Sequence, residues 1–200
     1  LFVVLKLNRH CREQILDLHK EITQHTLKDE QHEGKWRDNN EVVVGDPLNV
    51  DKIYHKPPDY KEIPKLMEEF CTFASNDEGE FLHPIIKGII LHFLIGYIHP
   101  FEDGNGRTAR TIFYWYVLTR GYWLFEFMAI SRIILKSKTK YGMAYLYTET
   151  DENDLTYFID YNLEVIERAF NDMEAYILLK QKEQSEALKF IKQVKNVNLR

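Results

Sequence analysis

Cysteine is scarce in this sequence, which has only Cys11 and Cys71 in 200 residues. Two cysteines cannot build the disulfide framework of a small secreted domain, and their spacing is not that of a metal-ligand pair. We therefore expect both thiols to be reduced and predict a cytoplasmic protein.

A membrane-spanning segment is also absent. The most apolar stretch, Leu82–Ile98, contains Lys87 and two histidines, and the apolar opening Leu1–Leu7 is too short for the core of a signal peptide. The sequence has no internal repeat and no low-complexity segment. We predict no contact with a membrane.

Strong net charge is missing as well. The formal charge is −5, so the chain has no general attraction to nucleic acid, although a local basic patch remains compatible with this value. With 44% hydrophobic and 28% charged residues, the composition is that of a globular protein able to bury a core.

Hydrophobic periodicity predicts a mainly α-helical bundle with one small β-hairpin. Two short β-branched stretches, 41–44 and 52–55, flank a turn at 45–47. The stretch 85–98 is apolar nearly all round, so we place this helix at the centre of the bundle. The predicted helices cover 9–30, 63–74, 85–98, 108–119, 131–135, 140–147 and 155–194, the last with one break.

The segment His99–Arg110 lies between two apolar helices and contains the residues best suited to chemistry. A helix that starts near Gly106 offers free backbone amides and a partial positive charge to an anion. Gly104 and Gly106 allow the backbone to form an anion nest, and Arg107 and Arg110 share a helix face from which both can grip phosphate oxygens. The segment therefore predicts a polyphosphate site.

Two further residues indicate the type of reaction. The carboxylate of Asp103 would repel a phosphate unless Mg²⁺ lies between them, and Mg²⁺ is usually held by one or two carboxylates together with substrate phosphates. His99 has an unperturbed pKa of ~6.5 and can accept a proton from an incoming hydroxyl. The combination predicts transfer of a phosphoryl or nucleotidyl group to a hydroxyl.

At this point the residues resemble a known family. His99–Arg110 matches every fixed position of the Fic signature, which is His-Pro-Phe, a variable residue, Asp or Glu, Gly-Asn-Gly-Arg, two variable residues and Arg. Gly34–Arg37 followed by Val42–Gly45 is similar to the segment that leads into the family's flap hairpin, and Asp154–Ile159 is similar to the start of its C-terminal helix. The resemblance implies one Fic-type helical bundle with a β-hairpin flap, with a core at about 34–170. Residues 171–200 would form a C-terminal helix that could lead to a further module.

The resemblance also implies an activity, which is the transfer of AMP from ATP to a Ser, Thr or Tyr hydroxyl of a target protein. The target would dock by strand addition at the flap, about Val42–Tyr54, and self-modification is possible. The implied roles are general base for His99, Mg²⁺ ligand for Asp103, core anchor for Phe101, and nucleotide contacts for Gly104, Asn105, Gly106, Arg107, Thr108, Arg110 and Tyr141. The family's Lys-Tyr-Tyr motif has Gly142 here in place of its second Tyr.

Several alternatives stay open. The same site could remove AMP from a protein or transfer another phosphoryl or phosphodiester group, and a vestigial site would fit a regulatory or DNA-binding protein. DNA binding would require a module after the C-terminal helix. We interpret His55, His83 and His92 as structural, and the match of Thr148–Asn153 to the family's inhibitory-helix pattern as chance. The dinucleotide-binding pattern at Gly104–Ala109 lacks the preceding strand that it requires.

Overall fold

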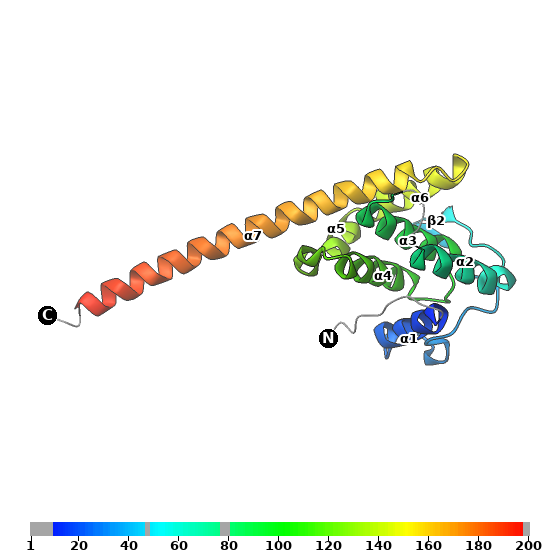
Figure 1. Ribbon diagram of the computed structural model, residues 1–200, viewed down its shortest axis with the longest axis horizontal. Coiled ribbons are helices and arrows are strands. Elements are labelled where there is room, and N and C mark those ends of the chain that lie inside the picture. Colours follow the sequence, from blue (N-terminus) through cyan, green and yellow to red (C-terminus); the bar gives the residue numbers. More distant parts are fainter. Residues whose placement is uncertain (1–9, 47–48, 77–80, 198–200) are drawn as a thin grey trace.

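The computed structural model describes residues 10–46, 49–76 and 81–197 (Figure 1). In this part the chain is mainly helical with one two-stranded sheet, as predicted. The elements are α1 (Cys11–Thr23), η1 (Glu30–His32), β1 (Val44–Asp46), β2 (Asn49–His55), η2 (Tyr60–Glu62), α2 (Ile63–Ser75), α3 (Pro84–Ile98), α4 (Asn105–Thr119), η3 (Trp123–Phe127), α5 (Ile130–Lys136), α6 (Lys138–Thr150) and α7 (Thr156–Val197).

Helices α3 and α4 pack together at the centre, with α1 and α7 on opposite sides of the pair (Figure 1). Ile89 and Phe93 of α3 face a core shared with α5, α6 and α7, whereas Leu91 and Ile95 face a second core shared with α1 and α2. A helix between two cores must be apolar on every side, which confirms the central position predicted for this segment.

The hairpin starts later than predicted. β1 and β2 are antiparallel, with Val44 opposite His55, so the prediction of a first strand at 41–44 and a turn at 45–46 was wrong. The Asn39 side-chain oxygen accepts a hydrogen bond from the Glu41 amide at 2.9 Å, which holds this part of the chain in a turn. Pro47, also in the predicted turn, lies outside the described residues.

Two predicted helix boundaries also need correction. The first helix ends at Thr23 rather than near residue 30, because His25 takes a left-handed backbone conformation (φ 58°) that a helix cannot continue through. The last helix has no break and runs continuously from Thr156 to Val197. Within the described ranges, no helix combines the length and the hydropathy that crossing a bilayer requires.

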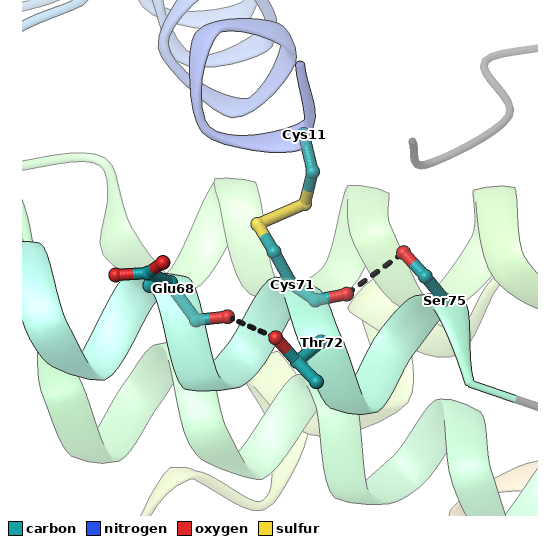
Figure 2. The surroundings of a disulfide bond; sticks show 5 residues. All are labelled: Cys11, Glu68, Cys71, Thr72 and Ser75. Atoms are coloured by element: carbon teal, nitrogen blue, oxygen red, sulfur yellow. Dashed lines mark hydrogen bonds between the residues drawn. A yellow bond between two sulfur atoms is a disulfide. The ribbon is translucent and has the colours of Figure 1, made fainter. Parts of the chain in front are cut away.

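The prediction of two free thiols was wrong, because Cys11 and Cys71 form a disulfide (Figure 2). The bond joins the start of α1 to α2, whose facing sides share Ile15, Ile63 and Met67 in one core. This packing brings the two Cα atoms to 5.8 Å, a normal distance for a disulfide. The cysteines therefore give no support to a reducing compartment, and the cytoplasmic location stays a prediction.

Removing the disulfide should destabilise the protein. The bond closes a loop with a sequence separation of 60 residues, and loss of such a bond typically costs about 2–4 kcal/mol. We expect the double variant Cys11→Ser/Cys71→Ser to show this decrease in the free energy of unfolding, measured with urea. Dithiothreitol should destabilise the original chain and leave the double variant unchanged. Equal stability of the two proteins would contradict the expectation.

Candidate active site

His99 ends α3 in a left-handed conformation, with φ 48° and ψ 57°. This conformation is uncommon for a residue other than glycine. The surrounding structure holds it through Arg37, which is 3% exposed: Nε donates to the His99 carbonyl and the backbone N–H donates to the Pro100 carbonyl, both at 2.8 Å. Other guanidinium N–H groups donate to the carbonyls of Asn39 and Pro58, so the same side chain also fixes the chain on both sides of the hairpin.

The His99 ring is arranged as a neutral base. Nδ1 lies 3.1 Å from the Gly96 carbonyl oxygen, which can only accept, so Nδ1 carries the proton and Nε2 keeps its lone pair. Burial lowers the pKa of His99 to about 4, and electrostatic interactions with His55 and Arg37 act in the same direction. The ring is therefore uncharged at neutral pH, with its one proton on Nδ1.

The loop after His99 is held by its own amide side chain. Asn105 accepts a hydrogen bond from the Phe101 amide at 2.9 Å and donates one to the Phe101 carbonyl at 2.7 Å. The buried hydroxyl of Thr108 donates to the Gly104 carbonyl at 3.0 Å. Asn105 and Thr108 thus stabilise the turn, whereas the sequence predicted only nucleotide contacts for them. Helix α4 starts directly after Gly104, close to the predicted start.

Helix α1 contacts the loop through His19, which was not among the predicted site residues. His19 is fully buried, and its ring stacks on Phe101 with 3.7 Å between centroids. Its Nε2 donates to the Asp103 carbonyl at 2.9 Å, while Nδ1 accepts from the Gly34 amide at 3.0 Å. Gly104 has φ 84°, and a Cβ there would lie 2.9 Å from His19 Nε2 and 2.7 Å from the Thr23 methyl group. The glycine is thus required by conformation and by space.

The two signature arginines lie in different surroundings. Arg107 contacts the hydroxyl of Thr26 and lies 3.4 Å from the exposed carboxylate of Asp103. Arg110 is partly buried and acts on the pKa of His92 and of Tyr141, although burial is the larger cause for both groups. Among the described residues no acidic side chain forms an ion pair with Arg110. Its positive charge is therefore available to a ligand.

A cavity of about 430 Å³ connects the predicted site residues. The loop after His99 and the hairpin both contribute to its lining. Its lining comprises His99, Gly96, residues 102–106, residues 42–45 with Tyr54 and His55, and Tyr141 and Tyr145 of α6. The predicted residues Asp103, Gly104, Asn105, Gly106 and Tyr141 thus lie with His99 at one cavity, whereas Arg107, Thr108 and Arg110 do not line it.

Tyr54 occupies the space beside Gly142, the position where this chain departs from the family motif. A Cβ on Gly142 would lie 2.8 Å from the Tyr54 ring. Tyr54 is buried at the end of the hairpin, whereas Tyr141 lines the cavity and forms a hydrogen bond with His92 at 3.0 Å. The small residue at 142 therefore lets an aromatic ring from the flap form this part of the cavity wall.

His55 fastens the hairpin to the helices. Nε2 donates to the Tyr97 carbonyl at 2.6 Å, and Nδ1 lies 2.5 Å from a carboxylate oxygen of Glu149 on α6. The latter contact does not have the angles of a hydrogen bond. The interpretation of His55 as a structural residue agrees with these contacts, but its proximity to His99 was not predicted.

Nothing in the described residues forms a protein-only metal site of three or more His, Cys, Asp or Glu side chains. Asp103 nevertheless fits a Mg²⁺ ion that takes its other ligands from substrate phosphates and water, because its carboxylate is 65% exposed beside the start of α4. Glu152, in the segment that matches the inhibitory pattern, is exposed in the turn after α6.

Comparison with known proteins gives consistent results. The sequence model of the Fic/DOC family matches residues 9–117. Proteins named protein adenylyltransferase Fic are 31% identical over 122 residues in Drosophila mojavensis and 34% identical over 100 residues in Nematostella vectensis. These matches cover 61% and 50% of this chain, and 21% of each relative.

Solved structures show the same fold. A Fic family protein from Desulfovibrio desulfuricans G20 superposes with a TM-score of 0.65 at 23% identity, covering 82% of this chain and 47% of the other. Residues 134–508 of Fic-1 from C. elegans give a TM-score of 0.60 at 18% identity, covering 88% of this chain and 47% of the other. The chain thus spans about a fifth of the curated relatives' length and about half of these structures. Together with the complete signature between α3 and α4, the family match over more than half of the sequence shows that the chain belongs to the Fic/DOC family.

Proposed function

We propose that this chain transfers AMP from Mg-ATP to a Ser, Thr or Tyr hydroxyl of a target protein. The observation that carries the proposal is the neutral ring of His99, which shares one cavity with the glycine loop and the hairpin. The names of the related adenylyltransferases support the same activity.

The phosphates would lie at the start of α4. Backbone amides of Asn105 and Gly106 are the first of the helix and have no partner within it, and the unpaired charge of Arg110 is close to Gly106. Arg107 would hold a terminal phosphate after leaving its weak contact with Asp103. Asp103 would hold Mg²⁺, which neutralises phosphate charge when bound.

The chemical step needs one base. The hydroxyl oxygen of the target forms a bond to the α-phosphorus, the bond from this phosphorus to the β-bridging oxygen breaks, and pyrophosphate leaves. His99 Nε2 accepts the hydroxyl proton, and its positive charge is stabilised by the Nδ1–H bond to the Gly96 carbonyl.

The target segment would lie along the hairpin as an added strand. Among the described residues β2 is the only strand paired with β1. The apolar side chains of Val43, just before β1, and of Ile53 in β2 are each 51% exposed. Backbone pairing at this edge would bring an extended segment, either of another protein or of a second copy, past His99.

Replacing His99 should separate transfer from binding. We expect His99→Ala to lower the transfer rate by about 10²–10⁴-fold, because only the base is lost, while the affinity for Mg-ATP changes little. Intact-mass measurement after incubation with ATP reports transfer, and calorimetry reports binding. Undiminished transfer would refute the role of His99. A mass increase equal to phosphate, or AMP loss from a modified protein, would indicate the alternative reactions, and absence of nucleotide binding would indicate a vestigial site.

The pH profile should reflect the lowered pKa of His99. Protonation removes the base, so kcat/KM should fall as the pH drops through about 4 and not through ~6.5. We therefore expect a plateau from pH 8 to about pH 5, measured as initial rates of AMP incorporation. Circular dichroism at each pH identifies any loss due to acid unfolding. A midpoint near 6.5 with the fold intact would contradict the expectation.

His19 should act as a positioning residue for the loop. His19→Ala removes the stack on Phe101 and the hydrogen bond to the Asp103 carbonyl, and a displaced site loses up to about 10²-fold in rate. His19→Gln can restore a donor to that carbonyl and should recover part of kcat. His32→Ala, on the exposed η1 segment, is the matched control. Equal kcat values for His19→Ala and the original chain would exclude the role.

A further inference from the structure

The second half of α7 carries apolar side chains with no cover among the described residues. From about Met173 onward the helix leaves the body of the molecule and continues alone (Figure 1). Ile177, Leu188 and Ile191 are 45–53% exposed there. A helix in water is stabilised mainly by packing of its apolar face, so this surface favours a partner.

Some of these side chains, together with the partly buried Met173, form one stripe with a symmetric spacing, whereas Tyr176, Leu178, Leu179 and Phe190, which are 52–66% exposed, lie on the other faces of the helix. When the polar residues Gln181 and Gln184 are counted with the apolar ones, members of the stripe recur at intervals of three or four residues, which places them on one face of the helix. The spacing is the same from both ends: the second member lies three residues and the third member seven residues from the first, at 170, 173 and 177 and at 191, 188 and 184. The stripe consists of Phe170, Met173, Ile177, Gln184, Leu188 and Ile191, with Gln181 near its centre. A second helix running in the opposite direction would meet the same pattern.

The charges beside the stripe have the matching arrangement. Glu167, Glu174 and Lys192 are separated by seven and 18 residues, close to two and five full turns, and therefore lie on the same flank. Acidic groups flank one end of the stripe and a basic group flanks the other. In an antiparallel pair, Lys192 of one copy lies beside Glu167 and Glu174 of the other, whereas a parallel pair places like charges at the same level.

An apolar groove continues the stripe onto the body of the molecule. It has a volume of about 470 Å³, and Leu163, Ile166 and Phe170 of α7 form one side of it. Trp123, which is 66% exposed, and Phe125 belong to the η3 side. The end of an antiparallel second helix, beyond Ile191, would reach this groove.

We propose that α7 is a self-association surface and pairs antiparallel with α7 of a second copy of this chain. In this register Phe170 lies opposite Ile191, Met173 opposite Leu188, and Ile177 opposite Gln184. The paired region, Phe170–Ile191, has 22 residues and is about 33 Å long. The two catalytic bodies then lie at opposite ends of the helix pair. This inference does not depend on the proposed AMP transfer.

Sedimentation equilibrium of the whole chain tests the association. We expect a dimer at micromolar concentration, and a monomer for the double variant Ile177→Asp/Leu188→Asp with unchanged thermal unfolding of the body. A monomer for the original chain at 100 μM, or a dimer that survives the double substitution, would overturn the proposal. If the original chain is a monomer, the stripe would have to bind a partner other than a second copy.

Charge reversal tests the direction. Lys192→Glu should raise the dimer dissociation constant on the order of tenfold, because residue 192 of each copy then repels Glu167 and Glu174 of the other, and Glu174→Lys added to it should recover part of the affinity. Lys182→Glu, on a different face of the helix, is the matched control and should have little effect. Equal effects at positions 182 and 192, or no recovery in the double variant, would contradict the antiparallel register.

Crosslinking gives an independent measurement of direction. Residue 181 lies at the centre of the proposed register, so Gln181→Cys should form an intermolecular disulfide on mild oxidation. Leu188→Cys should not, because its copy lies about 15 residues away along the pair, or roughly 22 Å. Efficient crosslinking at position 188 would indicate parallel helices and would overturn the proposal.

Discussion

The left-handed turn at His99 is the constraint on which the rest of the site depends. It ends α3, directs the imidazole to the cavity and starts the glycine loop. A non-glycine residue holds this conformation only where the surroundings determine it. Here the buried guanidinium of Arg37 donates to the His99 carbonyl. Because it also donates to the carbonyls of Asn39 and Pro58, one side chain sets the position of His99 relative to the hairpin.

The loop itself depends on contacts from outside the signature. His19 and Thr23 of α1 fill the space beside Gly104, and the amide of Asn105 closes the turn at Phe101. The backbone amides at the start of α4 are therefore fixed before any ligand arrives. A site that is already in place loses less free energy to ordering when it binds an anion.

The sequence predicts the parts of this molecule that are set by residues close together in the chain. The signature contains His99, the glycine loop and the start of α4, and the apolar run before it predicts a central helix. Contacts between distant segments could not be inferred in this way. The disulfide requires the packing of α1 on α2, and the role of His19 requires the loop to lie against α1. The hairpin began late because of a local Asx turn at Asn39, and the replacement of a family tyrosine by Gly142 is explained only by the Tyr54 ring.

The disulfide has a topological consequence for the flap. Cys11 precedes the hairpin and Cys71 follows it, so the whole flap belongs to a covalently closed ring of the chain. A protease that cuts an exposed hairpin would normally release the preceding segment. In this protein the disulfide would keep both pieces joined and α1 attached to α2. The contacts of His19 in α1 with the glycine loop would therefore remain after cleavage.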